Sequence, residues 1–210
     1  HDKDLKRTTN GNGLVSFKSI EELKSLTVGD DETIPTLEEA LNYIKHRCLV
    51  NIELVSAGSG GATAKLLESN KWDLDNIIIS SFKIEELKSF NSFLPNVKLG
   101  YLAMEVTTKQ AKELNRLNFY SIGLEKNCLN KDVLVQLHEL DLQVFVFTIN
   151  NIKEINHFTN MGVDGIITDY PDRIFWYNIN MNLLKIQNDY SWLISEDDEL
   201  KTKLWSSLRF

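Results

Sequence analysis

One glutamate, Glu53, stands at a point in the sequence where a carboxylate could bind a metal ion. The segment LVNIELV around it predicts a β-strand, whose side chains alternate between two faces. Because Ile52 and Leu54 suit a covering layer of helices, Glu53 would point to the opposite, inner face. A buried carboxylate is costly unless it pairs with a positive charge or coordinates a cation. An inward ion pair and metal ligation are therefore equally good interpretations of Glu53.

Two other polar residues, Asn150 and Asp169, follow predicted strands in the second half of the sequence. Asn150, in TINN, could contact a ligand or cap the helix that follows it. Asp169, in GIITDYP, precedes Pro171 and is typical of a turn into a helix. For both residues we favour the structural role.

Other groups that could act on a phosphate give weaker signals. The segment SAGSGGAT follows the strand of Glu53, and its glycines permit a close backbone approach, which is a weak indication of a phosphate cradle. Three histidines fall in predicted helices, where we expect solvated rather than catalytic side chains: His46, His138 and His157.

Six predicted strands would position the candidate residues. Each pair of successive strands is separated by enough residues for one helix, which implies parallel neighbours. The helix of PTLEEAL begins with a capping box formed by Thr36 and Glu39, and Gly162 is placed to end the helix before the last strand. The strands start near Leu49, Asn76, Val97, Phe119, Gln143 and Gly165.

The strand pattern fits an open doubly wound sheet or a closed TIM (β/α)8 barrel. No glycine fingerprint for a nucleotide follows any strand, so the α/β barrel is the better prediction. Such a barrel has eight strands, and its active site lies at their carboxyl ends. Only six strands are predicted, so we expect the first strand, the first helix and the second strand to precede His1.

The composition excludes several classes of function. The 210 residues are 42% hydrophobic and 25% charged, as in a soluble globular domain, and their formal charge of −7 argues against nucleic-acid binding. No apolar run has the length of a membrane span. Cys48 and Cys128 match neither a zinc site nor a disulfide framework and favour a reducing compartment, so the expected location is cytoplasmic.

With His1-Asp2, RTTNGNG, IPTLEEAL, NIEL and GVDGIITDYP in this order, the chain resembles the glycerophosphodiester phosphodiesterases. The resemblance runs from His1 to about Asp172. It implies a barrel domain over residues 1–178 that contains a small insertion at 3–32. Residues 179–210 would then form a helical tail.

The resemblance also implies a catalytic site. His1 matches the second of two catalytic histidines, and Glu53 matches one of three acidic ligands to a divalent cation, Ca²⁺ or Mg²⁺. The other histidine, in a His-Arg-Gly motif, and the other ligands, in a Glu-x-Asp motif, belong to two strands that this sequence does not contain. Val55 departs from the family, which commonly has lysine there. Phe147 stands where tryptophan is frequent, and it is expected, with Asn150, to bind substrate.

The function implied is metal-assisted hydrolysis of glycerophosphodiesters to glycerol 3-phosphate and an alcohol, with histidine acid–base catalysis. The expected partner is thus a small phosphodiester, with no nucleic acid and no membrane span. One alternative is a lysophospholipase D-type activity on lipids. Another is a barrel that binds ligand without catalysis, which Val55 favours. The chain as written keeps one of the two catalytic histidines and one of the three acidic metal ligands, so by itself it is expected to be inactive.

Overall fold

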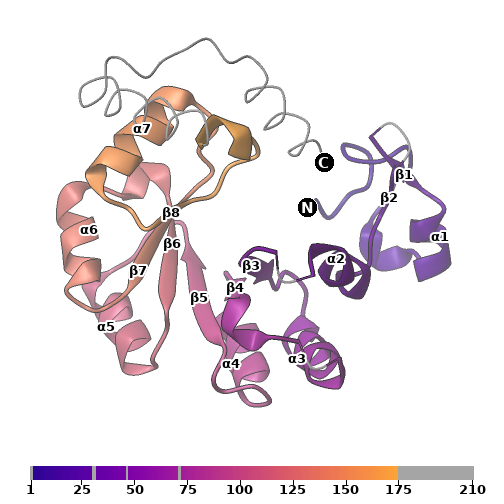
Figure 1. Cartoon of the computed structure of the whole chain (residues 1–210), viewed down its shortest axis with the longest axis horizontal. Helices are drawn as coiled ribbons and strands as arrows, with labels where there is room; N and C mark the ends of the chain where they lie inside the picture. Colours follow the sequence, from indigo (N-terminus) through magenta and orange to yellow (C-terminus); the bar gives the residue numbers. More distant parts are fainter. Residues whose placement is uncertain (1, 30–31, 46, 71, 175–210) are drawn as a thin grey trace, which may run out of the picture. The chain divides into compact units, whose positions relative to one another are not determined.

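A computed structural model describes residues 2–29, 32–45, 47–70 and 72–174 of the chain (Figure 1). The chain divides into two compact units, residues 1–102 and 103–210. His1, His46 and the tail predicted at 179–210 lie outside the described residues.

The first part of unit 1 contains short elements only. A 3₁₀ turn, η1 (Val15–Phe17), precedes helix α1 (Ile20–Lys24), which begins with a capping box made by Ser19 and Glu22. Strands β1 (Thr27–Val28) and β2 (Glu32–Thr33) then pair in antiparallel fashion.

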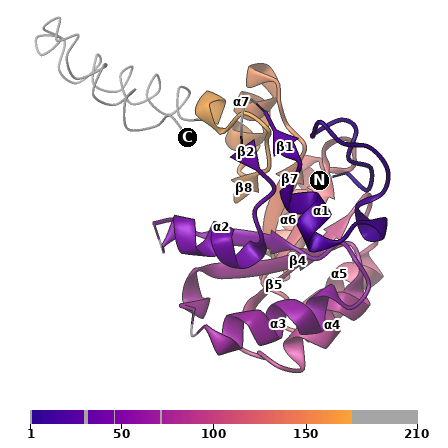
Figure 2. The same ribbon diagram turned by 90° about the vertical axis from the view of Figure 1, so that its right-hand side faces the viewer.

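The rest of unit 1 alternates strands and helices. Helix α2 (Leu37–Ile44) begins at the capping box of Thr36 and Glu39, which confirms that prediction. Strands β3, β4 and β5 pair in parallel in that order, with Glu53 opposite Ser80. Figure 2 shows helices α3 and α4 side by side along the strands. The elements after α2 are β3 (Val50–Glu53), α3 (Ser59–Ser69), η2 (Leu74–Asn76), β4 (Ile77–Ser81), α4 (Ile84–Asn91) and β5 (Lys98–Ala103).

Unit 2 repeats the same alternation. Strands β6, β7 and β8 are parallel and lie in that order. Gly162 ends α7 with a positive φ of 96°, as the sequence predicts, because a left-handed residue there lets the chain turn back to β8. The elements are α5 (Thr108–Arg116), β6 (Ser121–Glu125), η3 (Lys126–Cys128), α6 (Lys131–His138), β7 (Gln143–Phe147), α7 (Ile152–Met161) and β8 (Gly165–Ile166).

Apolar strand residues form the core of each unit. All five residues of β4 are buried, as expected for a strand that is covered on both faces. In unit 2, Ile122 and Leu124 of β6 and Val144 and Val146 of β7 are fully buried. Each such side chain contributes about 1.5–3 kcal/mol to stability. The six predicted parallel strands are thus confirmed in the described residues, although β8 is shorter than its sequence suggests.

Candidate functional site

Glu53 ends β3 and lies on the face opposite the buried residues of that strand. Its neighbours Ile52 and Leu54 are 9% and 2% exposed, whereas Glu53 is exposed. The predicted alternation is therefore confirmed, but the predicted burial of Glu53 is wrong, because the described residues do not cover this face. Glu53 makes no hydrogen bond or ion pair with any described residue. Its carboxylate oxygens are open to a ligand from outside.

A carboxylate suits a hard divalent cation, which prefers oxygen ligands. Glu53 fits such a cation as one ligand, because no described side chain competes for its oxygens. The described residues contain no group of three His, Cys, Asp or Glu side chains that could hold a metal ion. Glu53 could therefore hold a cation only together with further ligands.

Two hydrogen bonds connect the end of β4 and the residues after it to the two residues that follow Glu53. The Ser81 hydroxyl donates a hydrogen bond of 2.6 Å to the Leu54 carbonyl, and the Lys83 ammonium donates one of 2.8 Å to the Val55 carbonyl. Ser81 is buried, while Lys83 is exposed. Sequence reasoning missed Lys83. The available signal was a basic residue two positions after a buried strand, in IIISSFK.

The glycine-rich loop after β3 is occupied by a carboxylate of the protein itself. Glu86 of α4 accepts hydrogen bonds from the backbone N–H groups of Gly58, at 2.9 Å, and Gly60, at 2.8 Å. A Cβ on Gly60 would collide with the backbone carbonyl of Glu86, so the first turn of α3 needs glycine there. These amides are therefore not available as the phosphate cradle suggested by the sequence.

The same contacts lower the pKa of Glu86. The N–H groups of Gly60 and then of Gly58 stabilise the ionised carboxylate, so its pKa lies below the ordinary value of 4.5. Glu86 is buried, at 9% exposure. Because the pKa is lowered in the folded state, this stabilisation is complete above pH 4.5 and is lost as the pH falls through the folded-state pKa.

Replacing Glu86 by glutamine should lower the free energy of unfolding by about 1.5–3 kcal/mol at neutral pH, since two charge-assisted hydrogen bonds are weakened. Urea unfolding of both proteins at several pH values measures this difference. It should shrink as the pH falls below about 4.5, because the wild-type carboxylate then takes up a proton. Glu85→Gln on the exposed face of α4 is the matched control. A difference that is independent of pH would show that the charge of Glu86 plays no part.

In unit 2, Asn150 follows β7 and forms hydrogen bonds with the segment that follows β8. Its amide donates a hydrogen bond of 2.7 Å to the Asp169 carboxylate, and its side-chain oxygen accepts one of 3.0 Å from the Asp169 backbone N–H. The Arg173 guanidinium donates a hydrogen bond to the Asn150 carbonyl. Asn151 caps α7, so Asn150 does not have the capping role considered for it. The geometry supports the structural role of Asn150 and Asp169.

The structure also gives the positions of Phe147, His138 and His157. Phe147 is the last residue of β7 and is half-buried. His138 and His157 lie exposed at the end of α6 and on α7, as predicted. His138 contacts Asp164 through Nε2, at 2.7 Å, which gives it a structural partner.

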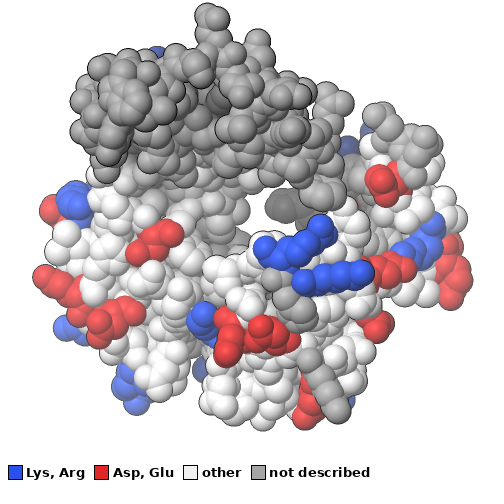
Figure 3. All heavy atoms as spheres, in the orientation of Figure 1, with Lys and Arg blue, Asp and Glu red and all other residues white. Residues whose placement is uncertain are grey.

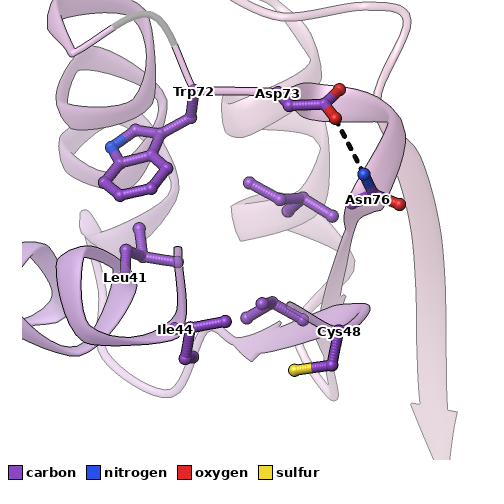
Figure 4. A pocket seen from close by; sticks show the side chains of 8 residues that line it. Leu41, Ile44, Cys48, Trp72, Asp73 and Asn76 are labelled. Carbon is purple, nitrogen blue, oxygen red and sulfur yellow. Dashed lines mark hydrogen bonds between the residues drawn. The ribbon is translucent and has the colours of Figure 1, made fainter. Parts of the chain in front are cut away.

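A small cavity in unit 1 lies at the wrong end of the strands to be the site. Its volume is about 10 Å³, enough for one water molecule. It lies at the amino ends of β3 and β4, where Asn76 donates a hydrogen bond of 2.7 Å to Asp73 and Trp72 lies above Leu41 (Figure 4). We assign it to packing. The lining residues are Leu41, Ile44, Cys48, Val50, Trp72, Asp73, Asn76 and Ile77.

Charged side chains of both signs are interspersed on the face drawn in Figure 3. On the described residues of that face, no broad surface is covered by lysine and arginine alone. None of the helices in the described ranges is long and apolar enough to span a membrane.

Comparison with known proteins gives consistent matches. The sequence model of the "Glycerophosphoryl diester phosphodiesterase family" matches residues 1–173. A glycerophosphodiester phosphodiesterase of Bacillus altitudinis is 32% identical over 192 residues, which cover 82% of this chain and 77% of that protein. A putative glycerophosphodiester phosphodiesterase of Bacillus subtilis is 30% identical, with 83% and 77% covered.

Solved structures agree with the sequence matches. A phosphodiesterase of Oleispira antarctica, in complex with the product sn-glycerol-3-phosphate, superposes with a TM-score of 0.73 at 28% identity. The match covers 83% of this chain and 76% of that one. A glycerophosphodiester phosphodiesterase of Thermotoga maritima gives a TM-score of 0.64 at 26% identity, with 85% and 77% covered.

Proposed function

Because the chain belongs to the glycerophosphoryl diester phosphodiesterase family, we propose that the protein hydrolyses glycerophosphodiesters to glycerol 3-phosphate and an alcohol. The fold is the family's α/β barrel, to which the described residues contribute three parallel strands in each unit. The family match over residues 1–173 is the observation that carries the proposal. The bound glycerol 3-phosphate of the Oleispira antarctica enzyme supports the choice of product.

We assign Glu53 to the binding of a divalent cation, Ca²⁺ or Mg²⁺. Support comes from its place at the carboxyl end of β3 and from its open carboxylate, since active sites of barrels lie at this end of the strands. Such a cation would neutralise a phosphate oxygen and lower the pKa of the attacking hydroxyl or water. The resemblance places two more ligands in a Glu-x-Asp motif outside this sequence.

The proton-transfer and substrate-binding roles follow from the resemblance. We assign His1 the role of general acid, which protonates the departing alkoxide, since an imidazole titrates near neutrality. Phe147 would offer the substrate an apolar surface at the end of β7. Asn150 would contact the substrate at the same edge, in addition to holding Asp169.

An assay of the full-length protein with glycerophosphocholine and Ca²⁺ or Mg²⁺ tests the function. We expect release of glycerol 3-phosphate that stops when a chelator is added, because the cation carries part of the transition-state charge. Lysophosphatidylcholine is assayed in parallel. Turnover of the lysolipid alone would replace the proposal by a lysophospholipase D-type activity, and turnover of neither would indicate a barrel that only binds.

A further inference from the structure

Lys83 begins helix α4 as its N-cap residue, and its ammonium reaches the segment that follows β3. In the segments that follow β3 and β4 and lead into the next helices, residues 54–58 and 82–83, Lys83 is the one basic residue. Val55, at 48% exposure, offers no charge in the segment that follows β3. Any positive charge that these two segments present at the carboxyl end of the strands therefore comes from Lys83.

Lys83 is held at both ends. Its backbone N–H donates a hydrogen bond of 2.9 Å to the Ser81 hydroxyl, and its ammonium donates one of 2.8 Å to the Val55 carbonyl. The Val55 carbonyl belongs to the residue two positions after Glu53. A long and flexible side chain is thus fixed across the ends of two neighbouring strands, next to the segment that carries the carboxylate.

The ammonium retains capacity for a further acceptor. It carries three N–H donors, of which the contacts within the described residues use one, on Val55. The Glu86 carboxylate accepts from Gly58 and Gly60 and forms no ion pair with Lys83 among the described residues, although the charge of Lys83 helps to lower the pKa of Glu86. Because Lys83 is exposed, an anion can reach the other donors.

From this geometry we propose that Lys83 binds the phosphate group of the substrate. The inference rests on the proposed function and deepens it by naming a phosphate-binding residue. The ammonium of Lys83 lies at the carboxyl ends of β3 and β4, where it can pair with a phosphate oxygen of a substrate that reaches these strand ends. Lysine serves as a point-charge phosphate ligand at many sites. Lys83 supplies, from the segment after β4, a positive charge that Val55 does not supply from the segment after β3.

Glycerol 3-phosphate binding to the full-length protein, measured by calorimetry and as product inhibition, tests this inference. Lys83→Met keeps the length of the side chain without its charge. We expect it to weaken glycerol 3-phosphate binding about 10-fold and to raise KM more than it lowers kcat, because the charged contact forms with the ground state as well. Lys83→Arg should restore most of the binding.

Lys88→Met, on the exposed face of α4, is the matched control and should leave binding unchanged. Thermal unfolding of each variant identifies the temperature below which all are folded, and binding is compared there. If the Lys83→Met and Lys88→Met proteins bound glycerol 3-phosphate equally well, the inference would be overturned. Lys83 would then have only the structural hydrogen bond to the Val55 carbonyl. Because calorimetry needs no turnover, a wild-type protein that binds glycerol 3-phosphate but hydrolyses nothing would refute the proposed function and still test Lys83.

Discussion

Replacing Glu53 by glutamine should lower the turnover of glycerophosphocholine by more than about 100-fold. Even residues that only support a metal ligand cost about 10–100-fold when they are removed, and a direct ligand should cost more. Glutamine keeps the size of the side chain but loses the charge that holds a hard cation. Steady-state kinetics of the full-length protein at saturating Ca²⁺ or Mg²⁺ give the change.

A binding measurement separates loss of the cation from loss of the fold. Calorimetric titration with Ca²⁺ or Mg²⁺ should show weaker binding for Glu53→Gln than for Glu85→Gln, since Glu85 lies exposed on the helix that follows β4. Glu53 is also exposed and makes no hydrogen bond or ion pair with any described residue, so the unfolding midpoint should hardly change. Undiminished metal affinity in Glu53→Gln would remove this residue from the site.

Replacing His1 by alanine should lower kcat by about 10²–10⁴-fold, the usual contribution of a positioned general acid or base. A general acid must be protonated to act, so the wild-type rate should fall as the pH rises through the pKa of His1. The variant should lose this limb of the pH–rate profile. Steady-state kinetics from about pH 5 to about pH 9 record both effects.

His157→Ala is the control for this experiment, because His157 lies exposed in the middle of α7. It should keep both the rate and the shape of the profile. Should His1→Ala turn over at the wild-type rate with the same pH dependence, the protonation of the leaving group must be assigned to another residue.

The local elements of the fold could be predicted because their signals lie close together in the sequence. Thr36 and Glu39 are three residues apart and form the capping box that begins α2. Gly162 ends α7 through its own backbone conformation. Strand alternation placed Glu53 on the face opposite Ile52 and Leu54 for the same reason, since it depends on the geometry of one strand.

The contacts around the candidate site depend on residues that are far apart in the chain. Glu86 binds an amide 26 residues earlier, and Lys83 binds a carbonyl 28 residues earlier. Neither contact has a periodic signal, because only the pairing of β3 with β4 brings the ends of these strands together. The glycines after β3 therefore resemble a phosphate cradle in the sequence, whereas in the structure the amides of Gly58 and Gly60 bind the Glu86 carboxylate.

Local spacing in the sequence was enough to predict the order of parallel strands and helices, the candidate ligand Glu53, and the motifs that resemble the phosphodiesterase family. These features depend on the spacing of residues that are close together in the sequence. The three-dimensional contacts were needed to show what occupies the glycine loop, which cation lies beside the end of β3, and that Asn150 binds Asp169. Hydrogen bonds between side chains and backbone act over about 3 Å. Which groups become partners therefore depends on how the strands pack and not on their separation along the chain.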